Sequence, residues 1–363
     1  MSCISKTLCF MFCLTFVLLL FVAVVFAAPP SELYPIVSGY TYPTDIARDP
    51  NDIPKEPLAN GATVTITAQE IEAFIAPADP TLAGPKWNNN GTDVKFKYFA
   101  FGGGHSGQDQ TPRVPGPFIR VKEGNTVTIK LVNNGTETHS IDFHAVLGMK
   151  GGAAMLLAGP GQTASLTATL NYPGIFVYHC TESGTPLGIA EHMNQGMFGL
   201  MLVEPKKGGD FKKLTKNSTE FYVFEQDVFR NNNGEFDEDK WATSLAPDYV
   251  VYNGRVGALI DHPLQAIKGK NAIIYHAAAG VHPPSFHIIG EIFDRVFNMG
   301  DLQSNPLRNV QTILIPTAGA VMIEMDGNKL IPTNQATGDI DIMVDHGSAY
   351  FRKGALGLML VNP

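Results

Sequence analysis

The sequence predicts an all-β protein made of two copies of one β-sandwich. Short runs rich in β-branched and aromatic residues, such as Thr126-Val127-Thr128-Ile129-Lys130-Leu131-Val132, alternate with turn residues. Glycine and proline are abundant, with 36 and 25 residues in a chain of 363, above their usual combined share of ~12%. Many short strands joined by tight turns would need them. The length leaves room for two domains, each able to bury its own core.

An internal repeat marks the two copies. Residues 196–205 (GMFGLMLVEP) return at the end of the chain as residues 354–363 (GALGLMLVNP), and residues 173–179 have a looser echo in residues 338–346. Two copies of one sandwich are the simplest account of this repeat. The expected segments are a first sandwich over 61–205, a linker over 206–214 and a second sandwich over 215–363.

The start of the chain has the features of an export signal. Lys6 precedes an apolar run over residues 8–26, and Ala27-Ala28 offers a cleavage site of small residues. We interpret residues 1–28 as a signal peptide, which predicts a periplasmic or secreted protein. A retained membrane anchor is the alternative, because the run is close to spanning length. The proline-rich residues 29–60 predict an extended arm that lies on the surface or on a neighbouring subunit.

Charge and cysteine content narrow the function. The net charge is −8 and the lysines and arginines are scattered, which argues against nucleic acid as a partner. Removal of residues 1–28 leaves Cys180 as the only thiol, so the mature chain cannot form an internal disulfide. The neighbouring His179 favours a metal ligand, while a buried hydrophobe or a reactive thiol are the alternatives.

Side chains suited to copper gather in two stretches of the first copy. A blue-copper site needs two imidazoles, one thiolate and a weak axial thioether. His139, Cys180, His192 and Met197 supply this set. Any one of them has an ordinary explanation, and Met197 in particular could be a core residue. The joint spacing favours copper.

A second set of three imidazoles comes from His144, His179 and His346. Three histidines with an open fourth position are a catalytic metal arrangement, although such a site also accepts zinc. Adjacent strand residues point to opposite faces. His179 and Cys180 are therefore expected to face two different metals and to join them through one short backbone path.

These motifs resemble those of the copper-containing nitrite reductases, which are two-domain cupredoxins. The resemblance runs from about Phe96 to Pro363. It implies two tandem cupredoxin-like Greek-key β-sandwiches with two coppers per chain. The pattern comprises His139-x-x-Asp142-x-His144, His179-Cys180, His192-x4-Met197, Phe286-His287-Ile288-Ile289-Gly290-Glu291 and Val344-Asp345-His346.

By this resemblance, a type 1 copper binds His139, Cys180, His192 and Met197, and a type 2 copper binds His144, His179 and His346. Asp142 and His287 match the catalytic pair of the family, and Ile289 would restrict the substrate pocket. The family also implies a homotrimer in which His346 acts across the subunit interface. The reaction would be the one-electron reduction of nitrite to nitric oxide in denitrification, fed by a small cupredoxin or cytochrome c.

The chemistry supports the catalytic pair independently. Nitrite reduction to nitric oxide and water consumes one electron and two protons, so two donors must lie within hydrogen-bond reach of a bound oxygen. Asp142 lies two residues from His144, which would aim both at one metal if the strand is regular. The alternative for Asp142 is to orient a ligand imidazole, and for His287 it is a core histidine.

Two other functions remain open at this point. A two-domain multicopper oxidase would need further imidazoles where Asp142 and Thr181 stand. A non-catalytic electron-transfer or copper-binding cupredoxin would leave the second site empty or filled with zinc. The segment 181–191 is longer than expected for the members that the chain most resembles, and we expect it to cover the type 1 copper. The remaining histidines are interpreted as surface or structural residues: His105, His262, His276 and His282.

Overall fold

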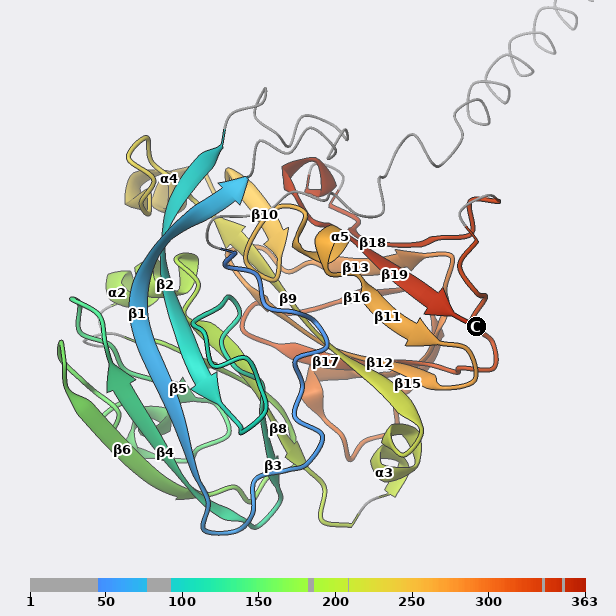
Figure 1. Cartoon of the computed structure of the whole chain (residues 1–363), viewed down its shortest axis with the longest axis horizontal. Coiled ribbons are helices and arrows are strands. Elements are labelled where there is room, and N and C mark those ends of the chain that lie inside the picture. The colour runs from blue at the N-terminus through green and yellow to red at the C-terminus, as the bar shows by residue number, and fades with distance from the viewer. Residues whose placement is uncertain (1–44, 77–92, 182–185, 208, 335–336, 348–349) are drawn as a thin grey trace, which may run out of the picture.

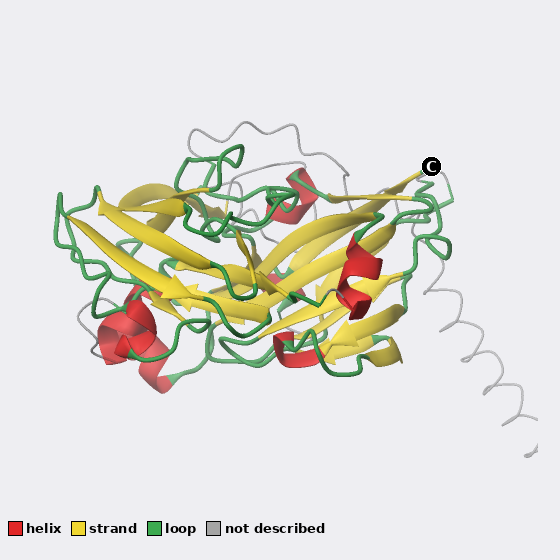
Figure 2. Cartoon of the chain, turned by 90° about the horizontal axis from the view of Figure 1, so that it is seen from below, coloured by secondary structure: helices red, strands yellow, loops and turns green. Residues whose placement is uncertain are grey.

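The computed structural model describes residues 45–363 apart from 77–92, 182–185, 208, 335–336 and 348–349 (Figure 1). The expected signal peptide and residues 29–44 of the expected arm lie outside the described residues. Within the described part of the chain, no helix is both long enough and apolar enough to cross a membrane. Strands dominate, and short helices lie around them (Figure 2).

The first half of the chain forms two four-stranded sheets, with strand orders β2-β1-β4-β6 and β3-β8-β7-β5. Alternation builds these strands: in β4, Val127, Ile129 and Leu131 are buried while Lys130 is exposed. The buried faces of the two sheets share one core, to which β7 contributes Tyr178 and β8 contributes Met201. The strands are β1 (Thr63–Ala76), β2 (Val94–Gly104), β3 (Ile119–Lys122), β4 (Thr126–Asn133), β5 (Asp142–Phe143), β6 (Thr163–Thr169), β7 (Gly174–His179) and β8 (Phe198–Glu204).

The second half forms a six-stranded sheet, β10-β9-β12-β17-β14-β15, and a five-stranded sheet, β11-β19-β18-β13-β16. The strands are β9 (Ser218–Val228), β10 (Tyr249–Tyr252), β11 (Leu264–Ile267), β12 (Asn271–Ala279), β13 (Ser285–Ile289), β14 (Phe293–Phe297), β15 (Leu307–Val310), β16 (Thr312–Leu314), β17 (Ala320–Met325), β18 (Asp341–Asp345) and β19 (Leu356–Asn362). The two halves lie side by side (Figure 1), and one core cluster contains residues of both.

The sequence repeat reappears as a repeat of topology. Strand β8 pairs in parallel with β3 and antiparallel with β7. Strand β19, which carries the second copy of the repeated segment, pairs in parallel with β11 and antiparallel with β18. The predicted fold class, all-β with two tandem sandwiches, is confirmed.

Short helices connect the strands. They are η2 (Met149–Gly152), α2 (Pro186–Asn194), α3 (Gly209–Thr215), α4 (Glu238–Thr243), α5 (Ala258–Asp261), η3 (Asn298–Gly300) and η4 (Phe351–Lys353). Helix α3 lies where a plain linker, 206–214, was expected, and its Phe211 and Leu214 are buried in the core cluster that spans both halves. The connection between the two sandwiches is therefore packed against them.

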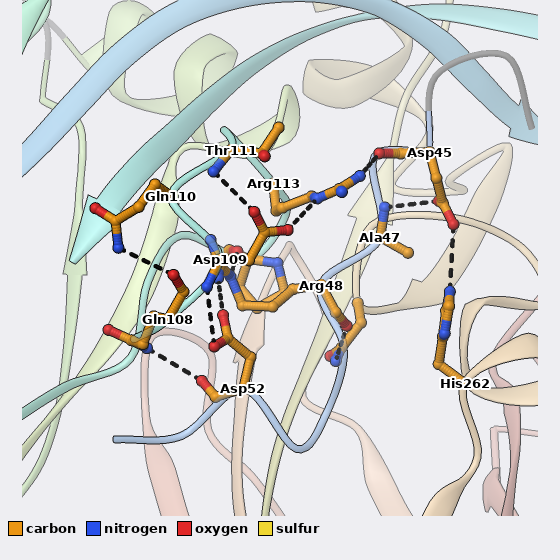
Figure 3. A network of polar contacts seen from close by, with 12 residues as sticks. Asp45, Ala47, Arg48, Asp52, Gln108, Asp109, Gln110, Thr111, Arg113 and His262 are labelled. Carbon is orange, nitrogen blue, oxygen red and sulfur yellow. Dashed lines mark hydrogen bonds and ion pairs between the residues drawn. The ribbon is translucent and has the colours of Figure 1, made fainter. Parts of the chain in front are cut away.

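The described part of the arm is bonded to both sandwiches. Arg48 is buried, donates from Nε to the Pro115 carbonyl at 2.7 Å and pairs with Asp52. Asp45 accepts from Arg255 Nε at 2.8 Å. Figure 3 shows its contact with His262. Polar bonds therefore tie the described part of the expected arm to the body of the molecule, although several of its side chains are exposed.

A buried ion pair also joins the two sandwiches. Arg120 in β3 donates to both carboxylate oxygens of Glu220 in β9, at 2.8 and 2.9 Å, and to Glu204 in β8 at 2.6 Å. The Tyr275 hydroxyl donates to Glu220 at 2.5 Å. A guanidinium held in this way fixes the angle between the sandwiches through several directional bonds.

Candidate metal centres

Three buried ligand side chains meet at one end of the first sandwich. His139 Nδ1 lies 3.3 Å from His192 Nδ1, and Cys180 Sγ lies 3.2 Å from His192 Nδ1 and 3.9 Å from His139 Nδ1. Nitrogen and sulfur ligands bonded to one metal at 2.0–2.3 Å lie about 3.3–3.8 Å apart. The three atoms therefore have the spacing of a single coordination sphere, and the donor set of two imidazoles and one thiol fits copper.

Met197 lies directly beside this group. It is fully buried, its carbonyl accepts from the Cys180 amide at 3.0 Å, and its amide donates to the His192 carbonyl at 2.9 Å. These two bonds tie it to both neighbouring ligand residues. The backbone of Met197 is thus fixed next to two of the predicted ligands, and its role as an axial thioether stays a prediction.

His192 comes from helix α2, which begins within the segment 181–191 that was expected to cover the type 1 copper. The ring is buried, and burial together with the nearby His139 lowers the pKa of His192 to about 3. The imidazole is therefore neutral at physiological pH, as a metal ligand must be. Ile189 and Met193 of the same helix line a cavity of about 490 Å³ that is also lined by His179.

Side chains that the sequence did not indicate support the first group. Glu70 in β1 places Oε1 3.6 Å from His139 Nε2 and is itself held by the amides of Thr136 and Glu137. The Ser140 amide donates to Cys180 Sγ at 3.4 Å. Partners of this kind orient ligands and tune the metal. Glu70 lies far from the ligands in sequence, so no spacing rule points to it.

A second group contains Asp142, His144 and His179, whose ligand atoms lie within 4.8 Å of one another. His144 Nε2 and His179 Nε2 lie 3.2 Å apart. His179 Nδ1 donates to the Cys180 carbonyl at 3.0 Å, which leaves its Nε2 to bind a metal. Strand β5 contains only Asp142 and Phe143, and Asp142 pairs with His179 in β7, so pairing across the sheet, and not one regular strand, brings these side chains together.

Gly151 in η2 packs against the Asp142 carboxylate. A Cβ at Gly151 would lie 1.6 Å from Asp142 Oδ1, and the backbone has φ of +63°. Only glycine allows both this conformation and this approach. The spacing of the motifs did not indicate this residue, whose only signal was the Gly151-Gly152 pair in a loop.

His287 and His346 lie together in the second sandwich. Their rings stack with centroids 4.9 Å apart, and His287 Nδ1 donates to the Gln311 carbonyl. Neither belongs to the group of Asp142, His144 and His179 within the described chain. His346 is exposed, and Ile289, two residues after His287 in β13, is 49% exposed. The predicted type 2 ligands are thus brought together only in part within one chain.

Exposed apolar side chains lie on both sandwiches, on the one that carries His144 and on the one that carries His287 and His346. Leu147, Met149 and Tyr172 are at least half exposed on the first sandwich, and His144 and Tyr172 line a pocket of about 320 Å³. On the second sandwich, Leu314 in β16 is 55% exposed next to β13. Apolar surface beside histidines is typical of a face that another molecule covers.

The other histidines differ from one another. His105 is buried and accepts from the Arg120 amide at 3.0 Å; burial first, and the nearby Arg120 second, lower its pKa to about 4. His262 contacts Asp45, and His276 is buried against Phe286. The contacts of His105, His262 and His276 are those of structural residues. His282 lies among carboxylates in a third group of ligand atoms, which its interpretation as a surface or structural residue did not anticipate.

The chain is similar to proteins of two named kinds. Residues 110–208 match a family model described as multicopper oxidase. The copper-containing nitrite reductase of Neisseria meningitidis serogroup B is 38% identical over 280 residues, 74% of this chain and 64% of that protein. The copper-containing nitrite reductase of Alcaligenes faecalis is 34% identical over 226 residues, 57% of this chain and 59% of that protein. The matched part therefore spans less than two thirds of these relatives.

Solved structures of the same two kinds of protein are similar to this chain in fold. The copper nitrite reductase of Nitrosomonas europaea superposes with a TM-score of 0.62 at 26% identity, covering 83% of this chain and 94% of that chain. A multicopper oxidase superposes with a TM-score of 0.62 at 20% identity, covering 92% and 97%, a likeness that concerns the fold alone. The resemblance in the sequence motifs is thus confirmed: the chain has the fold of two tandem cupredoxin-like domains and is similar in sequence to copper-containing nitrite reductases.

Proposed function

We propose that the protein is a copper-dependent nitrite reductase that forms nitric oxide. One observation carries the proposal: the adjacent residues His179 and Cys180 belong to two different groups of ligand atoms. Cys180, with His139, His192 and Met197, would hold a type 1 copper that receives electrons. His179, with His144 and His346, would hold a type 2 copper where nitrite binds.

The proposed reaction balances as nitrite plus two protons plus one electron, giving nitric oxide plus water. Copper, when bound, would supply the one-electron chemistry and an open position for the anion. Asp142 would hold one proton beside the bound oxygen, and His287 would deliver the second. Ile289, exposed beside His287, would narrow the space left to the substrate.

We infer further that the type 2 site is completed in a homotrimer. His346 is exposed and stands apart from His144 and His179 within the described chain. The apolar side chains around each part would be buried if the second domain of one subunit covered the first domain of the next. Asp142 and His287 would then meet across the same interface.

A mixing experiment tests this arrangement. One chain carries His144→Ala and the other carries His346→Ala; each is expected to form inactive homotrimers. If the ligands come from two subunits, co-assembled trimers contain an intact site wherever a native first domain meets a native second domain. Turnover should then return to a fraction of the wild-type rate. No recovery from trimers of verified mixed composition would mean that the site lies within one chain.

The reaction itself is tested by metal analysis with a nitrite assay. Nitric oxide should form from protein that carries two coppers per chain, and His346→Ala should abolish turnover while the absorption of the Cys180 thiolate persists. Absence of nitric oxide from fully loaded protein would refute the function. Loss of the thiolate band in His346→Ala would refute the division of ligands between the two sites.

A multicopper oxidase is the second candidate, because residues 110–208 match that family model. Such an enzyme would consume dioxygen at a cluster of three coppers. Asp142 and Thr181 stand where further imidazoles would be needed. Dioxygen consumption without nitrite turnover, at more than two coppers per chain, would favour the oxidase.

We propose that residues 1–28 direct export, so that the enzyme works in the periplasm or outside the cell. A small cupredoxin or cytochrome c would then supply electrons near Cys180, for denitrification. Fractionation of cells that express the whole chain tests the location, since cytoplasmic accumulation of the active enzyme would contradict it.

A further inference from the structure

A third group of ligand atoms lies in the second sandwich. Glu225 in β9, His282 before β13 and Asp345 at the end of β18 each offer one atom, all within 4.8 Å of one another. His282 Nε2 lies 3.5 Å from Asp345 Oδ2 and 4.0 Å from Glu225 Oε1. Ligand atoms that share one ion at 2.0–2.2 Å are about 3–4 Å apart, so the three side chains have the spacing of ligands around one metal.

The atoms that face one another in this group are buried and make few hydrogen bonds. Glu225 and Asp345 are each 2% exposed. Neither carboxylate oxygen of Glu225 has a hydrogen-bond partner among the described residues, and Asp345 Oδ2 and His282 Nε2 meet each other only as an ion pair at 3.5 Å. Asp345 Oδ1 is held by the amides of Ser285 and Gly347, at 3.0 and 2.9 Å, which directs Oδ2 into the group. Burying the Glu225 carboxylate beside Asp345 with so few partners is costly, and one cation could bind an atom of each of the three side chains.

The imidazole of His282 is already oriented for a ligand. Its Nδ1 lies 2.7 Å from Asp227 Oδ2, and the same carboxylate oxygen accepts from the Val281 amide at 2.7 Å. The ring of Tyr350 stacks on the imidazole of His282, with the ring centroids 4.0 Å apart. A carboxylate that fixes one ring nitrogen while the other faces the ion is the usual arrangement around metal-bound histidine.

The internal repeat places this group where the first sandwich has its own ligands. His139 precedes the first residue of β5 by three positions, and His282 precedes the first residue of β13 by three positions. Cys180 directly follows β7, and Asp345 is the last residue of β18. The strands β5 and β7 are antiparallel neighbours, as are β13 and β18. The two groups therefore occupy corresponding ends of the two sandwiches.

We propose that Glu225, His282 and Asp345 bind a divalent cation. One imidazole and two carboxylates favour a borderline or hard ion such as zinc and, without a sulfur ligand, disfavour Cu(I). The cavity of about 490 Å³ is lined by Asp227 and Val281 and brings solvent next to the group. This site is independent of the proposed nitrite reduction.

The metal-free alternative is a buried ion pair. Burial lowers the pKa of His282, but the Asp227 and Asp345 carboxylates raise it to about 9, so the empty group would hold an imidazolium. The two accounts differ in metal content. An ion pair binds none, whereas the site binds one ion per chain and loses it when a ligand is removed.

Counting metal separates these accounts. Copper-loaded whole protein is dialysed and titrated with Zn²⁺, and total copper plus zinc per chain is measured by mass spectrometry. Wild type and the matched control His262→Gln are expected to hold one equivalent more than Glu225→Gln and His282→Gln. The Cys180 thiolate absorption should be the same in all four proteins. Equal metal content in all four would overturn the proposal.

A gentler variant covers the case in which a ligand substitution prevents folding. Asp227→Asn keeps all three ligand atoms and only loosens the His282 ring. Zinc should then bind with the same stoichiometry but about 10–100-fold more weakly. Unchanged zinc affinity would overturn the proposed geometry, and so would the absence of zinc anomalous scattering between the three side chains in crystals of the zinc-titrated wild type.

Discussion

The contact between Gly151 and Asp142 yields the sharpest prediction about catalysis. In Gly151→Ala, the new Cβ would lie 1.6 Å from Asp142 Oδ1, so the carboxylate must leave its place beside His144 and His179. The backbone strain of alanine at φ of +63° costs about 1–2 kcal/mol. A positioned acid contributes about 10²–10⁴-fold to a rate. We expect displacement of Asp142 to lower kcat about 10–100-fold.

The assay is steady-state nitrite turnover on copper-loaded protein, with the Cys180 thiolate absorption as a check on the first group. Gly161→Ala is the matched control, because Gly161 has φ of +70° and a Cβ there would meet nothing within 4 Å. It should lose similar stability and keep full turnover. The loss should also vanish in an Asp142→Asn background, since the two changes act on one group. Wild-type turnover in Gly151→Ala would refute the reasoning.

Three further predictions concern ligand support, pH and the joint between the domains. Glu70→Gln should weaken copper at the first group about 10–100-fold, measured by chelator competition, because His139 loses its carboxylate partner. Burial and nearby carboxylates raise the pKa of Asp341 from 3.8 to about 7. As the pH rises from 4, the unfolded chain loses this proton before the folded protein does. The free energy of unfolding should therefore fall by up to about 4 kcal/mol between pH 4 and 7. Asp341→Asn should remove that fall in urea unfolding. Glu220→Ala should cost about 3 kcal/mol, because it leaves Arg120 with less charge compensation.

Each of these has a clear contrary result. Equal copper retention in Glu70→Gln would mean that the carboxylate does not orient the ligand. The same pH dependence in wild type and Asp341→Asn would mean that this carboxyl stays ionised in the folded protein. An unchanged urea midpoint in Glu220→Ala would mean that Glu204 and solvent compensate Arg120 fully.

The two ligand groups were predictable because their residues are close in sequence or follow a repeated strand. His179 and Cys180 are adjacent, so opposite orientation on a strand separates them into two sites. Asp142 reaches the second group differently from the expectation, since β5 has only two residues and pairing with β7 positions the carboxylate. Local spacing predicted the right neighbours for an incomplete reason.

The missed residues share a physical cause. Glu70 lies in β1, far before His139 in the sequence. Only the folded sandwich brings its carboxylate to the His139 ring. Gly151 matters through a backbone angle and a close approach. The third group combines residues from β9, the segment before β13 and β18, and no short motif contains them. Contacts between distant strands are fixed by the whole fold.

The docked arm sets a sequence of events during synthesis. Asp45 is made early, yet its partner Arg255 follows 210 residues later, and Arg48 is bonded by Asn253, 205 residues later. At about 5–20 residues per second, the arm waits about 10–40 s for these partners to emerge from the ribosome. The earliest described residues therefore reach their final place only when most of the chain exists. Closing the joint between the two domains would be a late step, and a nascent chain without its second half should leave the arm open to proteases.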